Sequence, residues 1–340
     1  MDMGVGAGPD PGGKRPDMVG LGTVALDTLE SPAGRVEEVP GGSALYFGAA
    51  AASYGAVGLI GAVGEDFPMA TLEGLAARGV DTRGLRRVAG PTFRWSARYD
   101  GSGRREVLRS VRNPNARPIF PDLAAYRDPP VLFLGSIDPR VQEEVLRESG
   151  SPGVVLLDTM SHWILERRPE VERLLASADV LLLNEEELLL LVDGGDQRAV
   201  PPVEGSGAAA DEGGGAAART EASMAAALLR RGPRWVIVKA GACGARGYTS
   251  YGCVEVAAVA VDSIVDPTGA GDAFAGGVAG VLAGEGEAGA PAGASPLPTA
   301  LDLLEKALRE GVRMGARAVS AFSLGGFLDP DPGGGEQAPP

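Results

Sequence analysis

The chain has 340 residues, 44% of them hydrophobic, which is enough for one large α/β domain or two ordinary ones. Its formal net charge of −14 argues against non-specific binding to nucleic acid or to an anionic membrane surface. Two cysteines and one histidine cannot build a Cys/His zinc site, and the sequence lacks an apolar run of about 18 residues that would span a membrane. Because no apolar signal core precedes the first strand, we expect a cytoplasmic protein.

Strands and helices alternate in the predicted elements up to residue 78. An apolar run predicts one buried first strand that ends at Asp27. The next segment, residues 28–39, is broken by Pro32 and Gly34 and is interpreted as a turn between short strands. The elements predicted here are a strand at 18–26, a helix at 43–54, a strand at 57–63 and a helix at 69–78.

Residues 93–111 depart from that alternation. Aromatic or small side chains alternate with polar ones up to Tyr99, residues 100–103 supply a turn, and the chain then returns. This pattern predicts a β-hairpin with a half-exposed face. Arg94 and Arg98 lie on one face of the hairpin, either as solvated charges or as contacts for an anionic or polyhydroxy substrate.

Alternation resumes after residue 130 and continues almost to the end of the chain. It predicts an α/β fold in which a mostly parallel central sheet carries helices on both faces. Two segments, 28–39 and 93–111, lie outside this repeat. The predicted strands lie at 131–134, 154–157, 180–183, 235–239 and near 247–261, and the predicted helices at 141–147, 168–176, 185–191, 220–231, 273–283 and 301–319.

Two low-complexity inserts interrupt the predicted domain, which spans residues 18–328. Residues 193–219 and 284–298 are rich in Gly, Ala, Pro and Glu, lack apolar side chains for packing, and are expected to be mobile surface loops. The terminal segments 1–17 and 329–340 are expected to be disordered tails.

The segment 266–277 carries the most chemical information. Gly269, Ala270 and Gly271 form a turn of small residues that opens a helix, and the unpaired N–H groups of a helix start attract phosphate. In a site that only bound phosphate, the carboxylate of Asp272 would repel the ligand. It is suited instead to act as a base that takes a proton from an attacking hydroxyl. We expect the helix dipole to keep Asp272 ionised, as a ready acceptor but a weak base. Helix capping alone is the structural alternative.

Two loose nucleotide motifs point to other classes of protein. Residues 20–25 fit the dinucleotide pattern G-x-G-x-x-A of dehydrogenases, which requires a helix directly after Gly22. The chain is instead predicted to continue as a strand. Residues 8–14 nearly fit a P-loop, but Arg15 replaces the Ser or Thr and no strand precedes them.

The segment 266–277, DPTGAGDAFAGG, resembles the C-terminal signature of the ribokinase-like (PfkB) carbohydrate kinases. The segment 41–55, GGSALYFGAAAASYG, is similar to their N-terminal signature, and the two occur in the family's order. The resemblance covers about residues 18–328. It implies ATP-dependent phosphotransfer to a hydroxyl of a small sugar or sugar-like acceptor, beneath a β-sheet lid built from segments 28–39 and 91–112.

The resemblance implies roles on the acceptor side of the site. Asp272 matches the catalytic base, with Gly269, Ala270 and Gly271 as the anion hole for the phosphoryl group. The substrate-binding candidates are Asp27, Gly41, Gly42, Tyr46 and, on the lid hairpin, Arg94. Tyr46 stands where the family usually has Asn, so it either contacts a substrate ring or belongs to the core.

The resemblance also implies a nucleotide side. Lys239, Gly241 and Gly244 match the strand and turn that meet the ATP phosphates, and Thr268 can donate to an anion. Asn184 and Glu187 match an Asn-x-x-Glu motif associated with indirect Mg²⁺ binding, although Asn followed by glutamates is also an ordinary helix start. Lys239 is otherwise a solvated charge at a strand end. A monovalent cation near Asp266 is a further cofactor candidate.

The expected partners are a small polyol or sugar and, through the lid, a second copy of the chain; no nucleic acid or membrane is expected. A nucleoside or inositol kinase of the same family is the alternative function. The alternatives from other classes of protein are a non-catalytic sugar or nucleotide sensor and a dinucleotide-dependent dehydrogenase. His162 follows a predicted strand, but without a visible partner it is weak evidence for catalysis.

Overall fold

The computed structural model describes residues 15–100, 105–113, 117–121, 124–193, 220–285 and 301–328. The predicted disordered tails and mobile inserts therefore lie almost entirely outside the described residues. Residues 15–17 of the predicted N-terminal tail are described, and among them Asp17 accepts a hydrogen bond from the Ala56 N–H at 2.8 Å. The first two residues of the predicted insert 284–298 belong to a helix that spans Ala270–Glu285.

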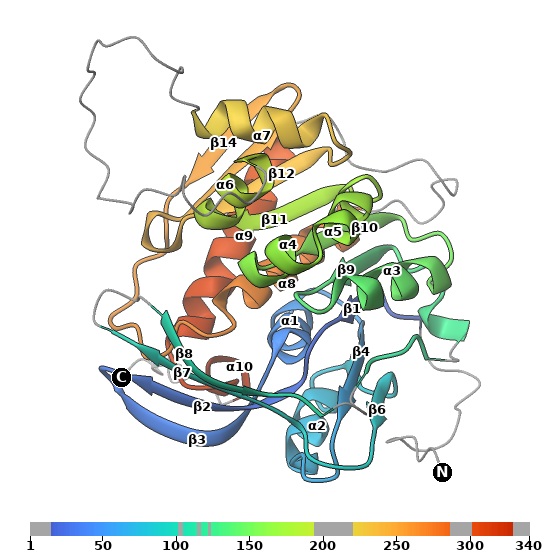
Figure 1. Ribbon diagram of the computed structural model, residues 1–340, viewed down its shortest axis with the longest axis vertical. Coiled ribbons are helices and arrows are strands. Elements are labelled where there is room, and N and C mark those ends of the chain that lie inside the picture. The colour runs from blue at the N-terminus through green and yellow to red at the C-terminus, as the bar shows by residue number, and fades with distance from the viewer. Residues whose placement is uncertain are drawn as a thin grey trace, which may run out of the picture.

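A large, mostly parallel sheet forms the centre of the molecule (Figure 1). Its strands are β1 Met18–Leu21, β4 Val57–Val63, β5 Val80–Asp81, β6 Leu85–Arg87, β9 Val131–Leu134, β10 Val154–Asp158, β11 Val180–Asn184, β12 Trp235–Lys239, β13 Ala245–Thr249 and β14 Gly252–Val256. Among the described residues their order is β14-β13-β12-β11-β10-β9-β1-β4-β5, with β6 paired to β4. All pairs are parallel except β12–β13 and β13–β14.

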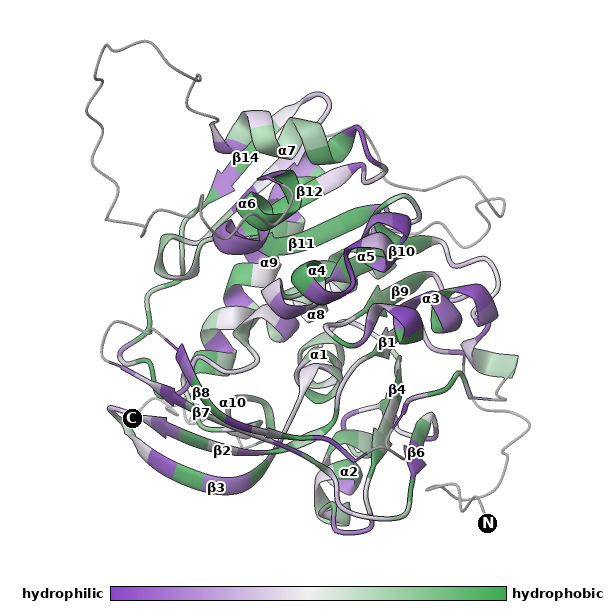
Figure 2. Ribbon diagram, in the orientation of Figure 1, coloured by the Kyte–Doolittle hydropathy of each residue, from purple (hydrophilic) through white to green (hydrophobic). Residues whose placement is uncertain are grey.

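Helices cover both faces of this sheet, as Figure 1 shows. Helices α1 Ser43–Ala51, α2 Met69–Ala76, α8 Ala270–Glu285, α9 Leu301–Val319 and α10 Gly325–Leu328 share one apolar cluster with the sheet. Helices α3 Pro139–Glu148, α4 Ser161–Glu166, α5 Arg168–Leu175, α6 Glu185–Asp193 and α7 Glu221–Leu229 share the other. The central strands are therefore apolar on both sides, and β11 is largely green in Figure 2. The predicted α/β fold class is confirmed.

A second, four-stranded sheet lies beside the first, in the order β3-β2-β7-β8. Its strands are β2 Ala25–Ser31, β3 Gly34–Gly41, β7 Phe93–Tyr99 and β8 Arg105–Val111. Strands β2 and β7 pair in parallel, so the two segments that fell outside the sequence repeat meet side by side. In Figure 2 the strands of this sheet carry both hydrophilic and hydrophobic residues, in keeping with a half-exposed sheet.

The single first strand predicted at 18–26 is wrong. The apolar run contains β1 of the large sheet and the start of β2 of the small one, separated by residues 22–24. A Cβ atom at Gly22 would lie 2.4 Å from Ser43 Oγ, so the chain can turn here only because residue 22 is glycine. Thr23 then bonds to Ser43 through two backbone–hydroxyl contacts of 2.9 and 3.2 Å, which anchor the break on the start of α1.

The short elements β5, β6, α4 and α10 were not predicted, and helix α8 begins at Ala270 rather than at residue 273. Elements of two to six residues are too short to show a period in the sequence. In the described part of the chain, no helix is long and apolar enough to cross a membrane.

Candidate active site

The candidate site follows the carboxyl ends of three neighbouring parallel strands. Asp158 ends β10, Asn184 ends β11 and Lys239 ends β12, where the register pairs Asn184 with Lys239. The Lys239 Nζ donates to Asp158 Oδ1 at 2.9 Å, and the Asp158 side chain is only 6% exposed. Open α/β sheets bind ligands at such strand ends.

Asp272 enters this group from the first turn of α8. Burial and the Asp158 carboxylate raise the pKa of Asp272 to about 7, and Lys239 opposes them. The expectation that the helix dipole keeps this group a weak base is therefore wrong, because desolvation outweighs the dipole. A carboxylate with a pKa near neutrality is well matched to accept a proton.

The turn before α8 depends on glycine. Gly269 has φ of 75°, and a Cβ atom there would lie 2.2 Å from the ring of Tyr46. At Gly271 a Cβ atom would lie 3.2 Å from the Lys239 Nζ. The helix start thus presents its N–H groups beside an ammonium group, which is a favourable setting for phosphate.

Asn184 and Glu187 form a reciprocal capping box at the start of α6. The Asn184 Oδ1 accepts from the Glu187 N–H at 2.8 Å, and Glu187 accepts from the Asn184 N–H at 2.9 Å. Burial raises the pKa of Glu187 to about 7, with Lys239 opposing and Asp158 adding to it. The two residues are therefore a helix start that also brings a buried carboxylate into the charge cluster.

Asp27 lies on β2 and within the electrostatic field of Asp272. It is 2% exposed, and burial raises its pKa to about 8, with further contributions from the carboxylates of Asp266 and Asp272. A Cβ atom at Gly41 would lie 2.0 Å from Asp27 Oδ2, and one at Gly42, where φ is 98°, would lie 2.5 Å from a backbone carbonyl oxygen. The diglycine is therefore required for the chain to pass against this carboxylate.

Tyr46 belongs to the packed interior and to the site at once. It is 1% exposed and lies in the large apolar cluster, yet its hydroxyl has no hydrogen-bond partner among the described residues. Burial raises the pKa of Tyr46 well above its ordinary value, and the carboxylates of Asp266, Asp27 and Asp272 add to the effect. The hydroxyl therefore lies within the field of all three acids.

Thr268 links the turn to the small sheet. Its hydroxyl and that of Tyr99, on β7, are 3.0 Å apart, and its N–H donates to Asp266 Oδ1 at 2.9 Å. The other carboxylate oxygen of Asp266 is buried without a partner in the described residues. The small sheet and the helix start are thus joined directly.

Gly241 and Gly244 shape a short 3-10 turn, Gly241–Cys243, after β12. Their φ values are 54° and 94°, and a Cβ atom at Gly244 would lie 2.0 Å from a carbonyl oxygen of β14. This turn follows Lys239 directly, so the three nucleotide candidates on β12 and its turn lie together.

Arg94 is not brought to Asp27. In the parallel register Trp95, not Arg94, pairs with Asp27, so alternation places Arg94 on the opposite face of the small sheet. Its guanidinium pairs with Glu38 at 2.9 Å and with Asp66 at 2.7 Å.

Asp158 was missed as a site residue by the sequence analysis. It is a carboxylate at the C-terminal end of a buried parallel strand, the same signal that singled out Asp27. His162, which follows it, is exposed and packs edge-on against the Trp163 ring.

The fold and this site define an α/β protein in which a carboxylate, Asp272, follows a turn that requires glycine and lies near the carboxyl ends of the parallel strands. Residues 23–324 match the model of the pfkB family carbohydrate kinases. The chain is 29% identical over 268 residues to a cytidine kinase of Thermococcus kodakarensis, covering 77% of this chain and 86% of that one.

Solved structures show the same fold. Adenosine kinase from Sinorhizobium meliloti superposes with a TM-score of 0.67 at 16% identity, over 91% of this chain and 95% of that one. Aminoimidazole riboside kinase from Salmonella enterica gives 0.62 at 23% identity, over 92% and 96%. The chain belongs to the pfkB family of carbohydrate kinases and is an ATP-dependent kinase of the sugar and nucleoside type.

Proposed function

We propose that the chain transfers the γ-phosphoryl group of ATP to a hydroxyl of a small sugar or sugar-like acceptor, with Asp272 as the base. The observation that supports this most is the position of Asp272. It lies in the first turn of α8, behind a turn that requires glycine, and its pKa is about 7. A capping carboxylate on a solvated helix has neither property.

In the proposed reaction, an oxygen of the acceptor forms a bond to the γ-phosphorus as the bond to the β,γ-bridging oxygen breaks. The acceptor proton passes to Asp272, and ADP leaves. The N–H groups of Gly269, Ala270 and Gly271 stabilise the charge on the phosphoryl oxygens, and Lys239 adds its positive charge beside them. Asp27 holds the acceptor against the Gly41–Gly42 backbone.

Mg²⁺ fits the nucleotide side, because Glu187 and Asp158 supply the buried carboxylate oxygens that this ion prefers. In the described residues no group of three or more His, Cys, Asp or Glu side chains is arranged to hold a metal directly, so we propose binding through water. When bound, Mg²⁺ neutralises charge on the phosphates. The unpartnered oxygen of Asp266 supports a monovalent cation there.

The Asp272→Asn variant tests this function. We expect kcat to fall on the order of 100- to 10,000-fold, with little change in KM for ATP, because asparagine keeps the shape but accepts no proton. ADP release is measured with a panel of sugars, nucleosides and inositol.

The matched control is Asp302→Asn, which changes an exposed first-turn carboxylate of α9. Near-normal turnover in Asp272→Asn would exclude the base. A sensor without catalysis would show no difference between wild type and variant.

A nucleoside acceptor is the second candidate. The cytidine kinase relative at 29% identity favours it, so cytidine belongs first in the panel. The dehydrogenase reading requires a helix directly after Gly22, whereas the chain enters β2.

We also propose a cytoplasmic location and a homodimer formed through the small sheet. Cys243 and Cys253 are both exposed and unpaired, which suits a reducing compartment. On the edge strand β8, Val107 and Leu108 are 51% and 47% exposed, which supports pairing with a second copy.

A further inference from the structure

Two neighbouring strands of the small sheet end against the segment that leads into α8. The hydroxyl of Ser31, the last residue of β2, donates to the Val265 carbonyl oxygen at 2.6 Å. The hydroxyl of Tyr99, the last residue of β7, lies 3.0 Å from that of Thr268. Because β2 and β7 pair in parallel, both contacts are made from the same end of the sheet. The small sheet is therefore attached at that end to the segment before α8.

These attachments connect two separate parts of the proposed site. Asp27 lies on β2 of the small sheet, whereas Asp272 lies in the first turn of α8. In the proposed reaction the acceptor must reach both, because Asp27 holds it and Asp272 takes its proton. The alignment of the acceptor with the base therefore depends on how the small sheet is fixed to the turn before α8.

Tyr99 is held well enough to fix this turn. Its side chain is 8% exposed and packs with Leu29 and Ala97 in the apolar cluster of the small sheet. A hydroxyl in such a setting needs a hydrogen-bond partner, because a buried polar group without one is costly. The Thr268 hydroxyl is that partner.

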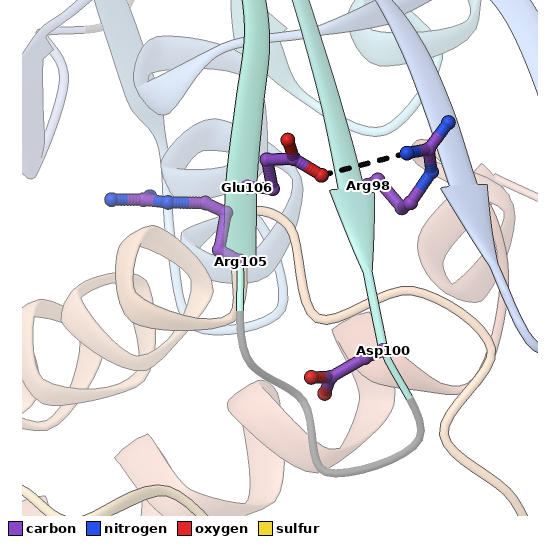
Figure 3. A pocket seen from close by; sticks show the side chains of 4 residues that line it. All are labelled: Arg98, Asp100, Arg105 and Glu106. Carbon is purple, nitrogen blue, oxygen red and sulfur yellow. Dashed lines mark hydrogen bonds and ion pairs between the residues drawn. The ribbon is translucent and has the colours of Figure 1, made fainter.

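The charged side chains at this end of the hairpin are directed elsewhere. Alternation along β7 places Arg98 on the opposite face of the sheet from Tyr99, and Arg98 pairs there with Glu106 at 3.5 Å. These two residues line a surface hollow of about 350 Å³ together with Asp100 and Arg105, as Figure 3 shows. The contact between the hairpin and the turn is made instead from the apolar face, through Tyr99.

Thr268 passes this contact on to the turn. Its N–H donates to Asp266 Oδ1 at 2.9 Å, and the next residue, Gly269, has φ of 75° and begins the proposed anion hole. A hydroxyl has one donor and two acceptor positions, so Thr268 can accept from Tyr99 and still donate to a phosphate oxygen. In that arrangement Tyr99 fixes the direction in which the Thr268 hydroxyl points.

We infer that Tyr99 is a positioning residue for phosphotransfer, which acts through the Thr268 hydroxyl and fixes the turn before α8 relative to Asp27. This inference rests on the proposed function of that turn. Phosphotransfer depends mainly on positioning, so a small displacement of the turn from the γ-phosphorus is costly. Loss of the Tyr99 hydroxyl should therefore slow the reaction more than it weakens binding.

The Tyr99→Phe variant removes the hydroxyl and keeps the ring in the apolar cluster. We expect kcat to fall about tenfold, with both KM values changed less than about twofold, because one hydrogen bond that aligns the turn is lost. The matched control is Tyr126→Phe, which removes a hydroxyl that donates to the Asp81 carbonyl oxygen at 2.9 Å, outside the site. This control should lose stability and keep kcat. If Tyr99→Phe keeps kcat as well, the inference is overturned.

A double-mutant cycle shows whether Tyr99 acts through Thr268. The Thr268→Val variant removes the threonine hydroxyl and keeps the shape, and Tyr99→Phe is then added to it. We expect no further fall in kcat in that background, whereas in Thr268→Ser, which keeps a hydroxyl, Tyr99→Phe should again lower kcat about tenfold. Equal losses in the valine and serine backgrounds would show that Tyr99 acts independently of Thr268, and would contradict the inference.

Amide hydrogen exchange gives a readout that does not depend on turnover. We expect the amides within residues 266–271 to exchange about fivefold faster in Tyr99→Phe than in wild type, because the turn loses an attachment, and to be unchanged in Tyr126→Phe. Unchanged exchange in Tyr99→Phe would exclude the positioning role. The proposed function fails separately, through normal turnover in Asp272→Asn or no ADP formation with any acceptor, and the exchange rates then still decide whether Tyr99 holds the turn.

Discussion

At the residue scale, two carboxyl groups, those of Asp272 and Asp27, have raised pKa values, and we expect the two to affect different measurements. Asp272 must be ionised to accept a proton, so its pKa of about 7 places the acidic limb of the reaction within reach of ordinary buffers. We expect log kcat/KM for the acceptor to rise with unit slope below pH 7 and to level off above it. Initial rates between pH 5 and 9 measure this.

The Asp27→Asn variant is the control for that profile. Asp27 has a pKa of about 8, so removing it should lower acceptor binding but leave the limb near pH 7 in place. If the limb disappears in Asp27→Asn, it belongs to Asp27, and the assignment of the base fails.

Asp27 should also reduce stability as the pH rises. The folded chain keeps its proton up to about pH 8, whereas an unfolded aspartate releases it near 3.9. Ionisation therefore favours the unfolded state, and this cost grows from about pH 4 to pH 8 and is constant above. We expect the Tm of Asp27→Asn to exceed that of wild type by more at pH 8.5 than at pH 5, by several degrees.

Asp302→Asn serves as the matched control here as well, because residue 302 is exposed. A Tm difference between Asp27→Asn and wild type that does not change with pH would contradict the raised pKa.

Residue identity alone could not have given these pKa values. The sequence placed Asp272 at a helix start, where the dipole lowers the pKa, but the opposing desolvation comes from residues distant in the chain. Asp158 shows the same limit, since only the register of β10, β11 and β12 brings its carboxylate to Lys239.

At the element scale, the turn before α8 gives a sharp prediction. Gly269→Ala must accept φ of 75° and place a Cβ atom 2.2 Å from the Tyr46 ring. We expect a loss of at least about 2 kcal/mol in the free energy of unfolding, together with a large loss of kcat. Urea unfolding and turnover are measured together.

The control for this variant lies in the same helix. Gly284→Ala meets no atom within 4 Å, and its φ is not positive, so it should raise stability by roughly 0.5–1 kcal/mol and leave kcat unchanged. If the two variants behave alike, the turn geometry is not what Gly269 provides.

Elements with a clear period were predictable, and the break within residues 18–26 was not. Strands β4, β9 and β12 and helix α9 match the predicted bounds, because continuous apolar runs and a long amphipathic face are local signals. The chain leaves the large sheet after β1 because Gly22 packs against Ser43, a contact that is not local.

At the scale of the whole molecule, the two sheets show which parts of a fold can be predicted from the sequence and which cannot. The large sheet follows from the alternation of strands and helices along the chain. The small sheet joins β2 to β7 across β3, α1, β4, α2, β5 and β6. The hairpin of β7 and β8 was predictable from its alternation, but the separation of β2 from β1 and its parallel pairing with β7 were not. The proposed acceptor side of the site depends on that pairing, because Asp27 lies on β2.

The small sheet leaves β8 as an edge strand, and this leads to the last prediction. An edge with exposed Val107 and Leu108 is a template for pairing with another strand, and a second copy presents the same edge. We expect a dimer in light scattering at micromolar concentration, and a monomer in the Val107→Glu/Leu108→Glu variant, because the charges oppose burial. Tyr251→Glu, at a residue 68% exposed outside this sheet, should remain a dimer. A wild-type monomer, or a dimer that persists in the double variant, would place the contact elsewhere or exclude it.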